Sequence, residues 1–313
     1  MTETTYSVIV LVEDTETNFI PFLTELSRQF SELALPHELV LAINGPGLFA
    51  QTCLREWPED AAPVQVFELT RKVPSGICLQ AVLSGLRGNI LITCGTYQQI
   101  ALPGLENLIA IVRDDQADLA LPWRKDRIDP LVNQWQSKAY NWLVQKLTKT
   151  RFHDLSSTLR VMRREVLEET ILYGDFFRYL PILAEKRGYR VLEVPAQHVE
   201  ERGKVGFYGI RSYVSRLVDL LTLRFNLGFV RKPLRYFGLR GGLLFLFGIG
   251  FMGFSVLSKL IWNDNLGDSS ALMIGLVLIL TGSGIWGVGL LGEILTFALG
   301  RKRKDYIVER VLE

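Results

Sequence analysis

The 313-residue chain has few of the residues that build disulfide frameworks and metal centres, with only three cysteines and three histidines. Cys53, Cys78 and Cys94 show no metal-ligand spacing, so we expect reduced, buried thiols. A formal net charge of +2 excludes a general nucleic-acid binder. The chain also has no internal repeat and no low-complexity segment.

The N-terminus lacks the apolar stretch of a signal peptide, since residues 1–5 are polar and include Glu3. Long apolar runs occur only near the C-terminus, at residues 241–262 and 271–299, and each is long enough for a membrane-spanning helix of roughly 20 residues. Basic residues flank the pair on both outer sides, whereas the connecting turn is acidic. The positive-inside rule therefore predicts a membrane hairpin with cytoplasmic N- and C-termini.

The first part of the chain alternates short apolar strands with amphipathic helices. Strands are predicted at 6–12, 38–43, 64–69, 89–93, 117–121 and 190–195, and helices at 18–30, 76–86, 105–113 and 131–147. This alternation indicates an α/β fold with a doubly wound, mostly parallel sheet. Ligands are expected at the carboxyl ends of the strands.

Residues 208–229 alternate arginine with apolar and aromatic side chains, which suits a helix at the membrane surface, although a core-facing helix fits the same pattern. We therefore expect four parts, namely a cytosolic domain (1–205), juxtamembrane amphipathic helices (206–238), two transmembrane helices (239–300) and a basic cytoplasmic tail (301–313).

Several segments, in order, resemble motifs of the family-2 glycosyltransferases that act on polyprenyl phosphate. Thr70-Arg71 opens a stretch similar to SRNFGK, residues 123–127 (WRKDR) are similar to GxRxxR, and residues 154–160 (DLSSTLR) look like DxTSGFR. Arg202-Gly203-Lys204 resembles the start of RxGxSKY, and Gly292-Glu293 echoes GEY. The resemblance implies a GT-A-like domain followed by a hairpin in the cell (inner) membrane.

The resemblance also implies a reaction. A polyprenyl phosphate oxygen attacks the anomeric carbon of a nucleotide sugar, while Mg²⁺ or Mn²⁺ held by an Asp-x-Asp pair stabilises the leaving diphosphate. The expected partners are a polyprenyl phosphate lipid, a nucleotide sugar and the membrane, and no nucleic acid.

The chain departs from the family at three donor motifs. The DADLQD segment aligns with residues 94–99 (CGTYQQ), so Cys94 and Thr96 replace both metal-binding aspartates. The DDGS turn is replaced by residues 43–46 (INGP), and Asp14 stands where the YNE motif has asparagine. No metal ligand is assigned at Cys94 or Thr96, because neither is a carboxylate.

Two interpretations of the altered donor site stay open. Asp14 and Glu16, with neutral oxygen donors at Asn44, Thr96, Gln98 and Gln99, could rebuild a weak Mg²⁺ or Mn²⁺ site. Alternatively, transfer proceeds without metal, and arginines neutralise the diphosphate. The arginines available for that role are Arg71, Arg124 and Arg127.

Candidate site residues follow from the aligned motifs. Donor-binding candidates are Asp14, Asn44, Arg71, Thr96 and Gln98, and lipid-phosphate candidates are Ser157, Arg160, Arg202 and Lys204. No catalytic residue is fixed, and the candidates are Asp154, Arg124 and Arg127. A solvated surface charge for the arginines, and a turn cap with a structural ion pair for Asp154, are the alternative interpretations.

Three functions fit these observations. The first is a membrane-bound glycosyltransferase that uses polyprenyl phosphate at the cytoplasmic face. The second is a catalytically inactive paralogue that binds lipid phosphate or partners an active enzyme, and the third is a membrane scaffold or transport accessory. Glycine-rich apolar helices would permit a homo-oligomer in each case.

Overall fold

The computed structural model describes residues 5–13, 19–33, 35–46, 57, 63–125, 131–170, 172, 174–199, 217–224, 233–262 and 270–300. The chain divides into two compact units, one ending at Asp219 and the other beginning at Leu220.

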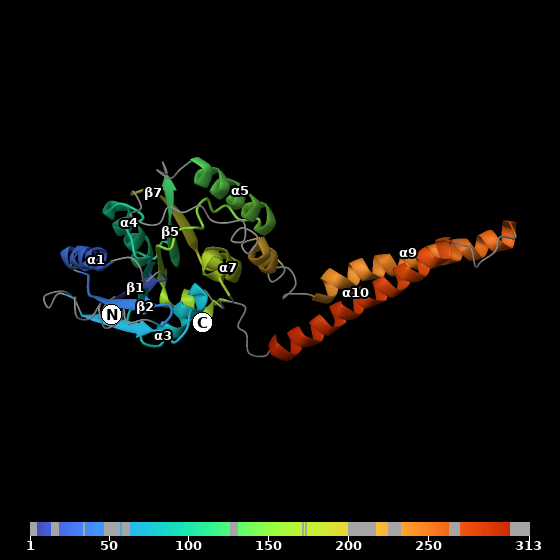
Figure 1. Cartoon of the computed structure of the whole chain (residues 1–313), viewed down its shortest axis with the longest axis horizontal. Coiled ribbons are helices and arrows are strands. Elements are labelled where there is room, and N and C mark those ends of the chain that lie inside the picture. Colours follow the sequence, from blue (N-terminus) through green and yellow to red (C-terminus); the bar gives the residue numbers. More distant parts are fainter. Residues whose placement is uncertain are drawn as a thin grey trace, which may run out of the picture. The chain divides into compact units, whose positions relative to one another are not determined.

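The first unit is built on a seven-stranded sheet with the strand order β3-β2-β1-β4-β6-β5-β7 (Figure 1). β6 runs antiparallel to β4 and β5, and the other strand pairs in the described sheet are parallel. The bounds are β1 (Tyr6–Val12), β2 (His37–Ile43), β3 (Val64–Glu68), β4 (Ile90–Cys94), β5 (Leu119–Lys125), β6 (Arg160–Arg163) and β7 (Val191–Gln197).

Helices cover both faces of this sheet, which explains why the central strands are apolar at consecutive positions rather than at alternate ones. All seven residues of β1 are buried. On one face, alternate residues of β1, β2 and β4 pack with α1 (Ile20–Glu32) and α4 (Leu102–Arg113) in a single apolar core. Both helices carry proline in their first turn, where the missing N–H removes no helical hydrogen bond.

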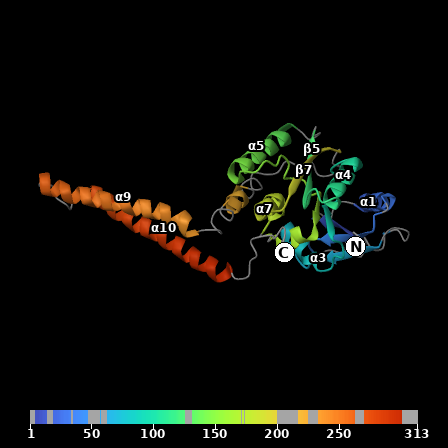
Figure 2. The same ribbon diagram turned by 180° about the vertical axis from the view of Figure 1, so that it is seen from behind.

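The remaining helices of the first unit complete its layers. α3 (Ser75–Leu83) and α7 (Leu180–Arg187) lie on the side of the sheet away from α1 and α4 (Figure 2). The short helices α6 (Arg164–Glu169) and η1 (Phe176–Tyr179) precede α7, and α5 (Leu131–Thr148) follows β5 in the chain. A helix–sheet–helix sandwich results, and the predicted doubly wound, mostly parallel sheet is confirmed.

The second unit contains two long helices, α9 (Pro233–Trp262) and α10 (Ser270–Gly300). Their apolar stretches are 29 and 26 residues long with mean hydropathies of 1.9 and 2.0, so both are long and apolar enough to cross a membrane. Gly241 lies against Gly282, and Gly248 lies against Gly275, which makes the two helices antiparallel neighbours. They form the apolar hairpin expected from the sequence.

Glycines allow the two helix backbones to approach closely. A Cβ at Gly282 would lie 2.6 Å from the backbone nitrogen of Phe245, and a Cβ at Gly248 would lie 2.8 Å from the carbonyl oxygen of Gly275. By contrast, Gly250, Gly253 and Gly284 have no atom within 4 Å of the same position. The glycines therefore divide into a set that packs the hairpin and a set that faces outward.

Candidate functional site

The carboxyl ends of β1, β2, β4 and β5 lie at one edge of the sheet. β6 is antiparallel and pairs Arg160 with Thr93, so its amino end lies at this edge too. The segments 95–99 and 154–159 therefore lie side by side where the strand ends meet. In open α/β sheets this edge is the place where ligands bind.

Asn44 joins the end of β2 to the segment that follows β3. Its Nδ2 donates to the carbonyl oxygen of Val73 over 2.6 Å, and its Oδ1 accepts the Val73 N–H over 2.8 Å. The neighbouring Gly45 has a φ of +135°, a conformation that glycine adopts without strain. Asn44 is thus placed at the predicted edge, where its amide holds the 70–74 segment in position.

Three further donor-binding candidates lie at the same edge. Arg71, within the segment that Asn44 holds, is exposed, whereas Thr96 and Gln98 are half-buried. Gln98 Nε2 donates to the carbonyl oxygen of Ile100 over 3.0 Å. Of these three residues, only Arg71 carries a charge, and its side chain is exposed to solvent.

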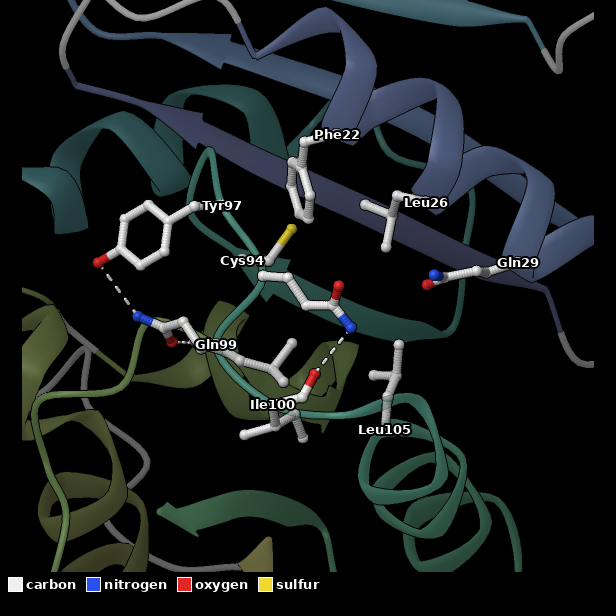
Figure 3. Close-up of a pocket in the computed structure, with 10 residues that line it drawn as sticks. Phe22, Leu26, Gln29, Cys94, Tyr97, Gln99, Ile100 and Leu105 are labelled. Atoms are coloured by element: carbon white, nitrogen blue, oxygen red, sulfur yellow. Dashed lines mark hydrogen bonds between the residues drawn. The ribbon is translucent and has the colours of Figure 1, made fainter. Parts of the chain in front are cut away.

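Gln99 is only 4% exposed, and its side-chain amide makes several hydrogen bonds at this edge of the sheet. Its Oε1 accepts from Ser157 Oγ (2.9 Å), Thr158 N (3.1 Å), Thr158 Oγ1 (3.3 Å) and Leu159 N (3.3 Å). Its Nε2 donates to the hydroxyl of Tyr97 over 3.3 Å, as Figure 3 shows. The sequence suggested Gln99 only as a neutral metal ligand, and its contacts with 157–159 could not be predicted without knowing that the two segments meet.

Thr158 is also held from two other directions. Thr93 Oγ1 donates to its carbonyl oxygen over 2.9 Å. A Cβ added at Gly95 would lie 3.2 Å from Thr158 Oγ1, closer than most Cβ contacts. The motifs DADLQD and DxTSGFR have alanine and glycine where this chain has Gly95 and Thr158. The smaller residue at 95 accommodates the larger one at 158.

Cys94 faces away from this meeting point. Figure 3 shows its sulfur directed toward Phe22 and Leu26 of α1, in a cavity of about 30 Å³. The thiol donates weakly to the carbonyl oxygen of Ile9 over 3.8 Å, and burial raises its pKa to about 12. Cys94 is therefore a protonated, apolar-facing thiol.

Arg124 and Asp154 form a buried ion pair. Arg124 Nε donates to Asp154 Oδ2 over 2.6 Å and its Nη2 donates to Oδ1 over 3.2 Å, with side chains only 3% and 4% exposed. Ser156 Oγ donates to Asp154 Oδ1 over 2.6 Å and accepts from Arg124 Nη2 over 2.8 Å. The pair fixes the start of the 154–159 segment, in agreement with the alternative of a turn cap with an ion pair.

Glu193 on β7 supports the same segment and was not predicted as a site residue. Its carboxylate accepts the backbone N–H groups of His153 and Asp154 over 2.8 and 2.7 Å. His153 Nδ1 lies 2.8 Å from Glu193 Oε2, and the imidazole stacks on Trp123 with ring centroids 4.4 Å apart. A glutamate in an otherwise apolar strand was the only signal in the sequence.

The lipid-phosphate candidates Arg160 and Ser157 are both buried. Arg160 donates to the carbonyl oxygens of Phe177 and, over 3.2 Å, Arg178, and its guanidinium lies 4.2 Å from the ring centroid of Phe177. Burial lowers the pKa of Arg160 to about 9, and the nearby charge of Arg178 acts in the same direction. Arg160 ties β6 to η1 rather than reaching the surface.

Asp14, Arg127, Arg202 and Lys204 lie outside the described residues. The site as described therefore brings together Asn44, Thr96, Gln98, Gln99 and the Arg124–Asp154 pair, with Arg71 exposed at the same edge.

The described residues do not fit the divalent metal that the resemblance implies. Cys94 is turned toward α1, and the amide oxygen of Gln99 is already accepting from its neighbours. Among the residues that the structure describes, no group of three or more His, Cys, Asp or Glu side chains could hold a metal ion. Within the described part of the chain, the carboxylates therefore do not form the cluster that such ions prefer, and Asp14 and Glu16 lie outside that part.

Solved structures share this fold. The glucosyl-3-phosphoglycerate synthase of Mycobacterium tuberculosis, determined with Mn²⁺, uridine diphosphate and phosphoglyceric acid, matches 72% of this chain and 79% of its own with a TM-score of 0.51 and 13% identity. The sheet with helices on both faces is therefore a GT-A-like fold.

The sequence relatives are more specific. The chain is 24% identical over 318 residues to the dodecaprenyl-phosphate galacturonate synthase of Rhizobium johnstonii, covering 98% of this chain and 93% of the relative. It is 25% identical over 310 residues to the undecaprenyl-phosphate 4-deoxy-4-formamido-L-arabinose transferase of Shewanella sediminis, covering 98% and 92%. No family model matches the chain. Along nearly its whole length the chain is thus similar to sugar transferases that act on polyprenyl phosphate, and the resemblance drawn from its sequence is confirmed.

Proposed function

We propose that this protein transfers a sugar from a nucleotide sugar to a polyprenyl phosphate at the cytoplasmic surface of the membrane. The observation that carries the proposal is similarity over 98% of the chain, which spans both the GT-A unit and the apolar hairpin. The names of the two relatives differ in the sugar but share the polyprenyl phosphate. The acceptor class is therefore the firmer part of the proposal.

The reaction needs no general base. The phosphate oxygen of the lipid is already anionic, so it attacks the anomeric carbon directly and forms the new C–O bond. The bond from that carbon to the nucleoside diphosphate breaks at the same carbon, and the diphosphate leaves with the electron pair. His153, the histidine next to the Arg124–Asp154 pair, therefore has no proton to accept in this step.

Two arginines among the described residues support a role of this edge in donor binding. Arg71 is an exposed cation at the carboxyl edge, beside the exposed Lys72, on a segment that Asn44 fixes through Val73. Arginine pairs well with phosphate oxygens, so Arg71 is proposed to bind the diphosphate of the donor. Arg124 stays paired with Asp154 and is proposed to position the 154–159 segment.

The hairpin is proposed to hold the first unit at the membrane. The outward side chains of α9 and α10 are large and apolar, such as Leu246, Leu260 and Leu280, which suits contact with lipid. Basic residues flank the hairpin on both sides, so the proposal places the N- and C-termini in the cytoplasm.

Product formation tests the proposal. The full chain is reconstituted with undecaprenyl phosphate, Mn²⁺ and the uridine-diphosphate forms of galacturonate and 4-deoxy-4-formamido-L-arabinose, and the lipid is analysed by mass spectrometry. We expect the mass of the lipid to increase by one sugar residue, and Arg71→Gln to raise the KM for the donor.

Ligand-binding measurements distinguish sugar transfer from the two other functions, an inactive paralogue and a scaffold. Calorimetry that shows polyprenyl phosphate binding without nucleotide-sugar binding would indicate an inactive paralogue. Binding of neither ligand would indicate a scaffold. Either result contradicts sugar transfer.

A further inference from the structure

We infer that Gln99 is a positioning residue that clamps the donor-side segment 95–99 to the segment 157–159, so that this side of the site is ordered without a divalent ion. The inference deepens the proposed function and rests on it, because that function identifies the segment 95–99 as part of the donor site. The contacts themselves are independent of that function.

The clamp is centred on one oxygen atom. Gln99 Oε1 accepts from two backbone N–H groups and two hydroxyls, all within three consecutive residues of the other segment, 157–159. One amide oxygen thus satisfies several buried groups. Leaving a buried N–H unpaired costs about 1–3 kcal/mol, and Gln99 prevents that loss at Thr158, whereas the Leu159 N–H also lies 3.3 Å from Ser157 Oγ.

The clamp is reinforced where the two segments leave the sheet. Thr93 bonds the carbonyl oxygen of Thr158, and Gly95 leaves the room that the threonine side chain needs. Thr158 is thus hydrogen-bonded to Thr93 and Gln99, and it fills the space left by Gly95. Contacts at positions 93, 95 and 99 fix both the distance between the segments and their register.

The chemistry of the clamp is unsuited to an ion. A cation that bound the Gln99 oxygen would displace the hydrogen-bond donors around that oxygen, because it would repel their partial positive charges. The neighbouring Gln98 is bonded to the Ile100 carbonyl, and the thiol of Cys94 is directed toward α1. The segment is therefore held by the protein itself, before any donor arrives.

Amide hydrogen exchange of the full chain in detergent tests the clamp. Gln99→Met keeps the length of the side chain but removes the acceptor, so the 157–159 amides should exchange about tenfold faster, as expected for loss of a buried hydrogen bond. Gln99→Glu should restore protection, because a carboxylate stabilised by several donors accepts the same bonds. Unchanged exchange in Gln99→Met would overturn the inference.

Gln98→Met is the matched control, since the amide of Gln98 bonds only its own segment in the described contacts. Its 157–159 exchange should equal that of the wild type, and the β1 peptide should stay protected in every variant that folds. If Gln99→Met does not accumulate, Gln99→Asn keeps an amide but shortens the side chain, so that its oxygen no longer reaches the opposite segment. Exchange at 157–159 that stays as slow as in the wild type in Gln99→Asn would then contradict the clamp.

A separate measurement tests whether the donor side is ordered without a divalent ion. Electron paramagnetic resonance of Mn²⁺ mixed with the wild-type chain, without nucleotide, should show only the spectrum of the free aqueous ion. A bound Mn²⁺ spectrum that is lost in Gln99→Met would overturn it. Because neither measurement uses sugar transfer, failure of the clamp is distinguishable from failure of the proposed function.

Discussion

Arg124 donates two hydrogen bonds to Asp154 across two segments that are 30 residues apart, and almost no solvent reaches either side chain. Removing one partner leaves the other charge buried and unpaired. We expect Arg124→Met or Asp154→Leu to lower the free energy of unfolding by about 3–5 kcal/mol. Thermal unfolding of the full chain in detergent measures the change.

The exposed pair Arg113–Asp114 provides the control. Arg113→Met should change stability little, because exposed ion pairs are screened by water and ions. Equal effects at Arg113 and Arg124 would show that the Arg124–Asp154 pair is solvated and does not position the 154–159 segment.

Restoring a carboxylate at position 94 should destabilise the protein rather than repair a metal site. Cys94→Asp would place the new carboxyl against Phe22 and Leu26, where burial raises its pKa. In the unfolded chain a carboxyl titrates near 4, so the penalty is absent below that pH. It grows by about 1.4 kcal/mol per pH unit above it, until the raised folded-state pKa is passed.

Urea unfolding of Cys94→Asp and Cys94→Ala between pH 4 and pH 8 checks this. The alanine variant removes the thiol without adding a charge, so its difference from the wild type should not depend on pH. A Cys94→Asp variant that is as stable as wild type at pH 8 and binds Mn²⁺ would show that position 94 faces the donor site.

The glycines of the hairpin give a matched pair of substitutions. Gly282→Leu should push α9 and α10 apart by about 2 Å, because a Cβ at Gly282 meets the backbone of Phe245 and interaxial distances follow the side chains at the contact. Gly284→Leu should leave the spacing unchanged, since that position is open. Pulsed electron paramagnetic resonance between spin labels at Leu246 and Val277, both exposed, measures the distance. Equal spacing in the two variants would contradict the antiparallel seam.

Glu293 on α10 accepts the N–H of Leu234 at the start of α9 over 3.2 Å. A carboxylate at a helix N-terminus satisfies a free N–H and complements the helix dipole. Glu293→Ala should therefore increase amide exchange of the 233–238 peptide by about fivefold, equivalent to roughly 1 kcal/mol. Glu293→Gln, which keeps an acceptor oxygen, should lie between the alanine variant and the wild type. Identical exchange in all three proteins would exclude the cap.

The strands with uninterrupted apolar residues could be predicted from the sequence. Residues 6–12 (YSVIVLV) match β1 at both ends, because a strand buried on both faces is apolar at nearly every position, and only Ser7 is polar here. β6 was missed, since Arg160–Arg163 (RVMR) is four residues long and begins and ends with arginine. α9 begins at Pro233, eight residues before the predicted apolar run, because proline is favoured in a first helical turn.

The site was predictable in position but not in contacts. Strand ends indicated the carboxyl edge, and Asn44, Thr96 and Gln98 lie there. The direction of Cys94 follows from alternation in β4, where Ile90, Ile92 and Cys94 share the face that packs on α1 and α4. The partners of Asn44 and Gln99 depend on segments 29 and about 60 residues away, which no local pattern specifies.

The initial rate of sugar transfer to undecaprenyl phosphate, measured with excess EDTA and again with Mn²⁺, tests the account most directly. If Gln99 orders the donor side and arginine binds the diphosphate, we expect product in both conditions. The two rates should lie within about twofold of each other, because no ion is needed to order the site. Product that appears only with Mn²⁺ would contradict the account.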